Sequence, residues 1–376
     1  MHINRLFLQN FRNHEETVIE SAPHVNVITG PNGAGKTNII DAIHYLCMSR
    51  SFISSSDRYV VAEGESYFTV EGAFEGNIRS SFEVGCRYSG SVGKKIFVNE
   101  SPLDRFTELI GMVPVVVLSP EDRRLTADGP AERRGFIDGF ISQISSTYLN
   151  DLVRYNRIRK QRNRILQESN GSRQMTESLL EPWTLQLIEV GSRIVRRRAA
   201  VLDRFRVYLD DQYQKLAGMV LKPDLTYRTF FDPEQFEGTI EEAFRMELEK
   251  TFERELEREQ TVTGPHRDEI VFHLGEMELR NYGSQGEHRL FTIALKLAQL
   301  FYYSDELEDL PLMLMDDVFG NLDPEKTQIV LRTLQEHPGQ TFITSASEEP
   351  FHSMEWDESG NNAWFRVMDG NVERVE

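Results

Sequence analysis

Gly30-Pro31-Asn32-Gly33-Ala34-Gly35-Lys36-Thr37 is the stretch that decides the fold, and it is a complete G-x-x-x-x-G-K-[ST] phosphate loop. The apolar run 25–29 precedes it and is typical of a strand. Apolar residues then recur at helical spacing, at Ile39, Ile40, Ile43, Leu46 and Cys47. Because strand, glycine loop and helix follow one another in this order, the stretch predicts an α/β fold that holds a nucleoside triphosphate.

The residue types of this loop explain how it would hold phosphate. Glycine at three positions lets backbone N–H groups turn toward phosphate oxygens without a clash from Cβ. The helix that begins near Lys36 adds the positive end of its dipole. We expect Lys36 to reach the β- and γ-phosphates and the Thr37 hydroxyl to ligate Mg²⁺. The predicted nucleotide-binding residues are Gly30, Pro31, Asn32, Gly33, Ala34, Gly35, Lys36 and Thr37.

A pair of carboxylates follows the apolar run 312–315. This run predicts a buried strand, and open α/β sheets place their ligands at the carboxyl ends of their strands. We expect Asp316 to hold Mg²⁺, directly or through water. Asp317 is placed to orient or deprotonate the attacking water.

Ser284-Gln285-Gly286-Glu287 opens a predicted helix that runs to about Tyr303. The Ser-x-x-Glu spacing is that of a capping box, which stabilises an ordinary helix start by about 1 kcal/mol. A capped helix start with a glycine at its mouth is also an anion site, so Ser284 could face a γ-phosphate as well.

Composition excludes several classes of protein. No apolar run approaches the length of a membrane span, and the first residues lack a secretory signal. The two cysteines, Cys47 and Cys86, form no metal pattern, so a reducing cytoplasm is expected. The net charge of -18 argues against a surface that is basic throughout, but it does not exclude a local basic patch for nucleic acid.

The order of the predicted elements indicates a split domain. Strand patterns dominate residues 1–120 and return in residues 260–376, whereas residues 121–259 are rich in Arg, Gln, Glu and Leu and predict helices. The runs 269–274 and 277–281 are predicted strands, and Asn170-Gly171-Ser172 and Lys222-Pro223-Asp224 are predicted breaks. We therefore expect an α/β head with a β-rich N-terminal part, formed by residues 1–120 and 260–376. An α-helical domain, residues 121–259, is inserted into it.

The order of these motifs resembles that of an ABC-type P-loop ATPase head, and within that class the chain resembles the RecF family. Gly320-Asn321-Leu322-Asp323 stands at the D-loop position and Thr344-Ser345-Ala346 at the switch position. Glu287-His288 stand where the family usually carries Gln-Gln. Further stretches similar to the family span nearly the whole chain: 8–13, 49–52, 118–122, 132–138 and 263–268.

The resemblance implies an ATP-dependent homodimer on DNA. In this class the signature serine, here Ser284 with Gly286 beside it, completes in trans the nucleotide site of a second chain. Arg12 and Asn13 match positions near the nucleotide in related heads. The family's partners are double-stranded DNA, single-strand/double-strand junctions and the mediator proteins RecR and RecO. The implied function is to recognise gapped DNA and to help load recombinase in replication-linked repair and the SOS response. ATP and Mg²⁺ are the implied cofactors.

Two clusters of arginine in the predicted helices are candidates for DNA contact. Between residues 154 and 206 there are 13 Lys or Arg against 5 Asp or Glu. Such clusters often form solvated helix faces, but they also suit salt-sensitive contact with DNA phosphates. The candidates are Arg154, Arg157, Lys160, Arg196, Arg197 and Arg198.

Other hypotheses stay open from the sequence. One is a short SMC-type head, although no sustained heptads indicate a long coiled coil. Another is a small-molecule P-loop kinase or GTPase, against which the Asp-Asp pair and the late Ser-Gln-Gly-Glu motif argue. Turnover also stays open: a weak DNA-dependent ATPase that uses slow hydrolysis as a release switch, or a DNA-binding protein clamped by ATP with negligible turnover.

Overall fold

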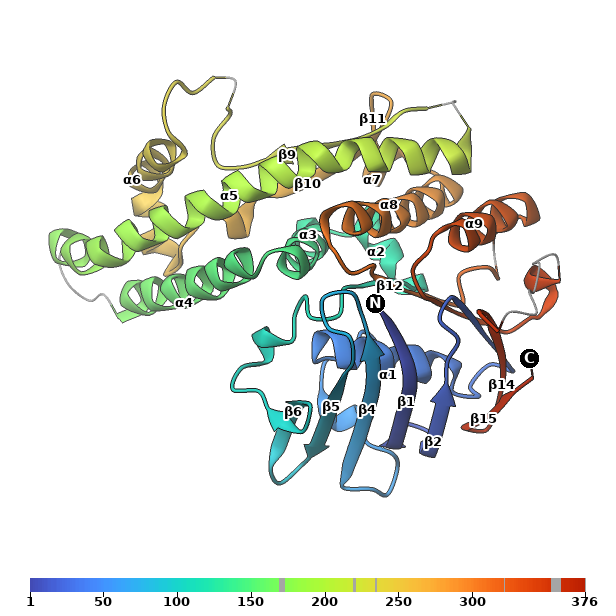
Figure 1. Ribbon diagram of the computed structural model, residues 1–376. Helices are drawn as coiled ribbons and strands as arrows, with labels where there is room; N and C mark the ends of the chain where they lie inside the picture. The colour runs from blue at the N-terminus through green and yellow to red at the C-terminus, as the bar shows by residue number, and fades with distance from the viewer. Residues whose placement is uncertain (169–172, 219–220, 234, 321, 353–359, 376) are drawn as a thin grey trace. The chain divides into compact units, whose positions relative to one another are not determined.

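The computed structural model describes residues 1–168, 173–218, 221–233, 235–320, 322–352 and 360–375 (Figure 1). The chain forms two compact units. The sheet unit comprises Met1–Asp122, Gln214–Gly218 and Ile293–Glu376, and the helical unit comprises Arg123–Tyr213 and Met219–Thr292. Within the described residues, no helix is long and apolar enough to cross a membrane.

One sheet of the sheet unit is mostly parallel, with the strand order β15-β14-β3-β13-β12-β8. Strands β3 and β12 lie on either side of β13, and all three are buried along their whole length, as expected for a parallel sheet covered on both faces. Only the edge strand β15 pairs antiparallel. The strands are β3 (Val25–Thr29), β8 (Val115–Leu118), β12 (Leu312–Asp316), β13 (Thr341–Ser345), β14 (Ala363–Met368) and β15 (Asn371–Arg374).

The other sheet of this unit is antiparallel, with the order β2-β1-β4-β5-β6-β7. Its apolar side chains, such as Leu8 and Phe68, join the core of the unit. The strands are β1 (His2–Phe11), β2 (His14–Glu20), β4 (Tyr67–Glu75), β5 (Phe82–Ser89), β6 (Gly93–Val98) and β7 (Ser101–Pro102).

Helix α1 (Lys36–Met48) packs against strands of both sheets. This position explains why it is apolar almost all round, with Ile40, Tyr45 and Leu46 fully buried on different faces. Because α1 begins at the phosphate loop, both sheets hold that loop in place. The unit also contains α9 (Pro324–Glu336) and the short 3₁₀ helices η1 (Asp57–Val60), η2 (Phe106–Glu108), η3 (Pro120–Asp122) and η5 (Glu349–Phe351).

The helical unit is built on the antiparallel pair α4 and α5. Ion pairs and hydrogen bonds fix their register, including Arg193 to Asp151 and Arg162 to Thr184. The last turn of α5 belongs to the sheet unit. A capping box between Thr239 and Glu242 starts α6. The helices are α2 (Arg123–Ala127), α3 (Pro130–Ile144), α4 (Ser146–Glu168), α5 (Arg173–Ala217) and α6 (Ile240–Arg258).

A small antiparallel sheet, β11-β10-β9, completes this unit. It consists of β9 (Pro223–Arg228), β10 (Glu269–Leu274) and β11 (Met277–Glu278). The 3₁₀ turn η4 (Pro265–Arg267) precedes β10, and α7 (Leu279–Tyr282) follows β11. Helix α8 (Gln285–Glu306) begins in the helical unit and continues into the sheet unit.

The expected fold class, an α/β head with a β-rich N-terminal part and a helical insertion, is confirmed. The division into units differs from the expected one in two places. Gln214–Gly218, inside the expected helical segment, belong to the sheet unit, and the helical unit extends to Thr292 and not to residue 259. The reason for this extension is that β10 pairs with β9, which lies inside the expected helical segment. The run 277–281, expected to be a strand, is a strand only to Glu278 and then turns into α7. The predicted break at Asn170-Gly171-Ser172 lies outside the described residues.

Candidate nucleotide-binding site

The phosphate loop joins β3 to α1, and two of its glycines leave no room for a side chain. A Cβ on Gly30 would lie 2.2 Å from the carbonyl oxygen of Val367, and one on Gly35 would lie 2.6 Å from Asn13 Oδ1. Both have positive φ, as does Gly33, where a Cβ would meet no neighbouring atom. Backbone conformation alone therefore explains the glycine at position 33. At positions 30 and 35, the close approach of neighbouring atoms also requires glycine.

Neighbouring segments hold the carbonyl groups of this loop. Asn13 donates an amide hydrogen to the carbonyl oxygen of Ala34, at 2.9 Å, and the N–H of Gly370 donates to the same oxygen, at 3.0 Å. His14 Nε2 lies 3.1 Å from the carbonyl oxygen of Gly35. With these carbonyls tied back, the first N–H groups of α1, which have no carbonyl partner inside the helix, remain for an anion.

Lys36 folds back over the loop. Its ammonium donates to the carbonyl oxygens of Gly30, at 2.8 Å, and Pro31, at 2.9 Å. Burial lowers the pKa of Lys36, and the charges of Asp317 and Asp316 act in the opposite direction. The cation is therefore placed between the loop and the carboxylates at the end of β12.

The two aspartates after β12 have different surroundings. Asp316 is buried, and its Oδ1 accepts hydrogen bonds from the hydroxyls of Thr37 and Thr344, both at 2.7 Å. Burial raises the pKa of Asp316, while these two hydrogen bonds oppose the rise. Asp317 is exposed and has a left-handed φ of 44°. Its N–H donates to the Thr344 hydroxyl at 3.0 Å, so one threonine fixes both aspartates.

The sequence did not reveal this role of Thr344. The sequence placed Thr344 only in the motif at the switch position. Its hydroxyl is fully buried and committed to Asp316 and to the N–H of Asp317. The available signal was a hydroxyl side chain at the start of the switch motif, where the strand ends.

Arg12 and Asn13 lie at the turn between β1 and β2. Asn13 contacts the loop directly, through Ala34. The guanidinium of Arg12 instead pairs with the buried carboxylate of Asp41 in α1, at 2.8 Å, and donates to Ser51 at 3.0 Å. Arg12 thus also holds α1 against β1, and the sequence gave no sign of Asp41 as its partner.

Ser284 starts α8 through the expected capping box. Its N–H donates to Glu287 Oε2 at 2.7 Å, and the N–H of Glu287 donates to the Ser284 hydroxyl oxygen at 3.3 Å. The bond from the Ser284 N–H lowers the pKa of Glu287. Ser284 and Gly286 are exposed, and no atom would crowd a Cβ on Gly286. A helix start with an accessible serine and glycine can meet a second molecule.

The expected D-loop is only partly described. Asn321 of the expected D-loop lies outside the described residues. The aspartate that ends this motif, Asp323, caps α9 by accepting from the N–H of Lys326 at 2.9 Å.

The arginines predicted to contact DNA have unequal surroundings. Arg154 pairs with Glu189, and Arg196 with Glu241, at 3.7 and 3.0 Å. Arg157, Lys160 and Arg197 are exposed.

Arg198 must be removed from the predicted DNA-binding residues. Only 2% of its side chain is exposed, and its guanidinium binds Asp138 at 2.8 Å, Asp268 at 3.2 Å and the carbonyl oxygen of Pro265 at 2.7 Å. Helical spacing turns Arg198 into the core while its neighbour Arg197 faces solvent. Its charge serves the fold of the helical unit.

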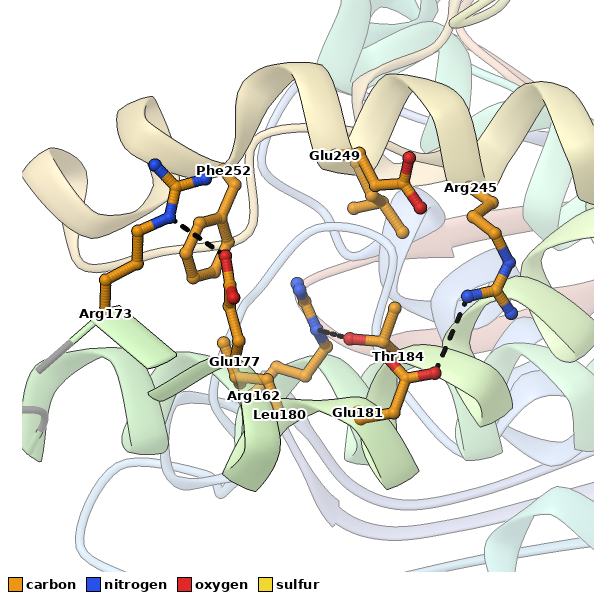
Figure 2. A pocket seen from close by; sticks show the side chains of 10 residues that line it. Arg162, Arg173, Glu177, Leu180, Glu181, Thr184, Arg245, Glu249 and Phe252 are labelled. Atoms are coloured by element: carbon orange, nitrogen blue, oxygen red, sulfur yellow. Dashed lines mark hydrogen bonds and ion pairs between the residues drawn. The ribbon is translucent and has the colours of Figure 1, made fainter. Parts of the chain in front are cut away.

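A cavity of about 310 Å³ opens between the start of α5 and α6 (Figure 2). Its charged side chains are matched: Arg173 pairs with Glu177 at 3.0 Å and Arg245 with Glu181 at 3.6 Å. We assign it no ligand. The lining residues are Arg162, Arg173, Glu177, Leu180, Glu181, Thr184, Arg245, Leu248, Glu249 and Phe252.

Comparison with known proteins shows to which family this chain belongs. The family model described as RecF/RecN/SMC N terminal domain matches residues 2–360. A protein of Salinibacter ruber named DNA replication and repair protein RecF is 43% identical over 355 residues, which cover 93% of this chain and 86% of that protein. This chain belongs to the RecF family. A RecF protein of Chloroherpeton thalassium is 36% identical over 357 residues, covering 93% of this chain and 96% of that protein.

Solved structures place this RecF-family chain in the same fold. The recombination mediator protein RecF with ATP, in the RecFOR pathway, superposes with a TM-score of 0.90 at 30% identity, covering 100% of this chain and 98% of that one. An SMC head bound to the C-terminal winged-helix domain of ScpA gives a TM-score of 0.58 at 14% identity, covering 100% and 97%. At that identity the second likeness shows the fold alone.

Proposed function

We propose that the chain binds ATP at Gly30–Thr37, pairs with a second copy of itself on DNA, and acts in replication-linked recombinational repair. One observation carries the ATP site: side chains from helix α1 and from two neighbouring strands meet at a single carboxylate oxygen. Thr37 follows β3, Thr344 lies in β13 and Asp316 ends β12, and both hydroxyls lie 2.7 Å from Asp316 Oδ1. The sheet therefore places the acidic pair beside the phosphate end of the loop.

The same oxygens fit Mg²⁺. This ion takes one or two protein oxygens and fills its remaining positions with water and phosphate oxygens. The Thr37 hydroxyl and the Asp316 carboxylate are hard oxygen donors already in contact. We propose them as the protein ligands of the ion.

Each remaining residue of the site has a distinct proposed role. Lys36 neutralises phosphate charge, and the loop amides and the start of α1 bind phosphate oxygens. Asp317, exposed beside Asp316, orients or deprotonates water. Bound ATP supplies the γ-phosphoryl group, whose slow hydrolysis releases the dimer.

The dimer is proposed because Ser284 and Gly286 form an exposed, capped helix start in the other compact unit. In the solved relative the bound nucleotide is ATP. We infer that Ser284 of one chain contacts the ATP held by Gly30–Thr37 of its partner, so that ATP binding and pairing are one event.

DNA and mediator proteins complete the proposal. The curated relatives are named DNA replication and repair proteins. We propose that the chain binds double-stranded DNA and single-strand/double-strand junctions. Its proposed task is to recognise gaps and to help load recombinase. The proposed protein partners are RecR and RecO. Exposed Arg157, Lys160 and Arg197 remain candidates for the DNA contact.

The test compares Lys36→Arg with Asp317→Asn by ATP hydrolysis and by light scattering on gapped DNA. Lys36→Arg should neither hydrolyse ATP nor dimerise, because it loses the ammonium geometry of the loop. Asp317→Asn should bind ATP and remain trapped as a dimer on DNA. Lys250→Arg, an exposed lysine paired with Glu247, serves as the control. Normal hydrolysis by Asp317→Asn would show that another group activates water.

A second candidate is an ATP-clamped DNA-binding protein with negligible turnover. Under this alternative the wild type and Asp317→Asn would dissociate from DNA equally slowly in ATP.

A further inference from the structure

The turn 263–268, which belongs to the stretches similar to the RecF family, has no place in the nucleotide site. It is rigid: the N–H of Arg267 donates to the carbonyl oxygen of Gly264 at 2.8 Å, and a Cβ on Gly264, whose φ is +128°, would lie 2.4 Å from the Tyr155 hydroxyl. His266 is bonded on both sides, to Tyr155 at 2.8 Å and to the carbonyl oxygen of Thr261 at 3.0 Å. Neither ring nitrogen of His266 is left for a ligand.

Three arginines from three different elements converge on this turn. Arg267 belongs to the turn and is exposed. Arg134 reaches it from α3 and donates to the carbonyl oxygen of Asp268 at 2.8 Å. Arg159 lies in α4, one helical turn after Tyr155, whose hydroxyl binds His266.

The electrostatic environment of His266 and Arg134 agrees with this convergence. Burial lowers the pKa of His266 to about 3, and the positive charges of Arg159, Arg267 and Arg134 lower it further. Burial also lowers the pKa of Arg134, with Arg198 and Arg267 adding to the effect and Asp268 and Asp138 opposing it.

The carboxylates near the turn already bind another cation, the buried guanidinium of Arg198. Asp138 and Asp268 both bind the buried guanidinium of Arg198. Asp268 also accepts hydrogen bonds from the hydroxyls of Tyr227 and Thr229. Within the described residues, neither Arg159 nor Arg267 forms an ion pair. The arginines that line the cavity of Figure 2 are instead matched by glutamates.

We propose that Arg134, Arg159 and Arg267 form a contact for the phosphate backbone of DNA. The proposal rests on the proposed DNA-binding function and adds a site to it. Planar guanidinium groups bind phosphate in a two-pronged geometry, and a compact group of cations attracts a polyanion. Because the contact is with phosphate, it gives affinity and salt dependence without sequence preference.

The test measures the affinity of the ATP-bound protein for gapped duplex DNA across a salt titration. The variant is the double substitution Arg159→Gln with Arg267→Gln, which leaves the more buried Arg134 in place. We expect its Kd to rise by roughly tenfold per arginine, and the slope of log Kd against log salt to fall by about 0.9 per lost phosphate contact. ATP affinity and melting temperature should match the wild type.

Arg164→Gln is the matched control, because Arg164 is an exposed arginine of the same helix that pairs with Glu168 at 2.8 Å. It should keep the wild-type affinity and slope. A double variant with wild-type Kd and slope would overturn this inference alone, and would point to an acidic protein segment as the occupant. A wild-type protein that binds no DNA with ATP would overturn the proposed function, and this inference with it.

Discussion

Thr344 is the side chain that joins the two aspartates of the candidate site. A hydroxyl has one proton to donate and lone pairs to accept, and Thr344 uses both: it donates to Asp316 and accepts from the N–H of Asp317. It also supports the left-handed backbone at Asp317. The position of both carboxylates therefore depends on a residue that is proposed to touch neither ATP nor Mg²⁺.

Thr344→Val should impair the site while Thr344→Ser should not. Valine keeps the volume but removes the hydroxyl that donates to Asp316, and it leaves the N–H of Asp317 only the carbonyl oxygen of residue 344, at 3.2 Å. Loss of the hydrogen bond to the carboxylate should cost about 1.5–3 kcal/mol, so ATP hydrolysis should fall by roughly tenfold or more. The Mg²⁺ concentration needed for half-maximal ATP binding should also rise. If Thr344→Val kept the wild-type Mg²⁺ dependence and turnover, the positioning role would be wrong.

Arg198 and Arg197 are neighbours in sequence with opposite roles. Arg198→Met would leave the buried Asp268 and the half-buried Asp138 without their cation, and should destabilise the protein by about 3–5 kcal/mol. Arg197→Gln, on the exposed side of α5, should change stability by less than about 0.5 kcal/mol. Urea unfolding of both variants measures the difference. Equal stability would contradict the buried role of Arg198.

The residues of the nucleotide site could be predicted where chemistry fixes the residue type. Gly30 and Gly35 are required by close backbone approach, and Thr37 lies in contact with Asp316, the other residue expected to hold Mg²⁺. Arg198 could not be placed, because in a run of three arginines only packing decides which one turns inward. The partnership of Arg12 with Asp41 joins two segments and leaves no local pattern.

At the scale of elements, α8 combines a stable helix start with a charge that opposes its proposed ligand. The side chain of Glu287 caps the helix through the N–H of Ser284, and a glutamine would make the same hydrogen bond. The capping role thus needs the shape of Glu287 and not its charge.

Glu287→Gln should therefore keep the melting temperature and strengthen ATP-driven dimerisation. The cap is retained, and a negative charge that faces the γ-phosphate of the partner is removed. Sedimentation of the variant and the wild type over a range of ATP concentrations measures the dimerisation constant. Ser284→Ala, which removes the cap hydroxyl, is the contrasting variant. Weaker dimerisation of Glu287→Gln would mean that the charge contributes favourably.

Elements whose pattern is local were predictable from the sequence. Strands β3 and β10 have the predicted bounds, and β12 differs by one residue. Strand β9 was missed because Lys222-Pro223-Asp224 has the composition of a break, yet Pro223 is tolerated as the first residue of the strand. Its partner β10 lies far along the chain, so the pairing depends on tertiary structure.

At the scale of the whole molecule, the phosphate loop and Ser284 belong to different compact units. The boundary near Asp122 was predictable from the change in composition. The boundary at Thr292 was not, because it falls inside the continuous helix α8. The proposal that Ser284 acts on a second chain is the central claim at this scale.

Mixing two inactive variants tests that claim most directly. One chain carries Lys36→Ala and keeps Ser284, and the other carries Ser284→Ala and keeps Lys36. If the site is shared between chains, each mixed dimer contains one intact site, so ATP hydrolysis and ATP-dependent binding to gapped DNA should reappear only in the mixture. A mixture that remains as inactive as its separate components would contradict the composite site.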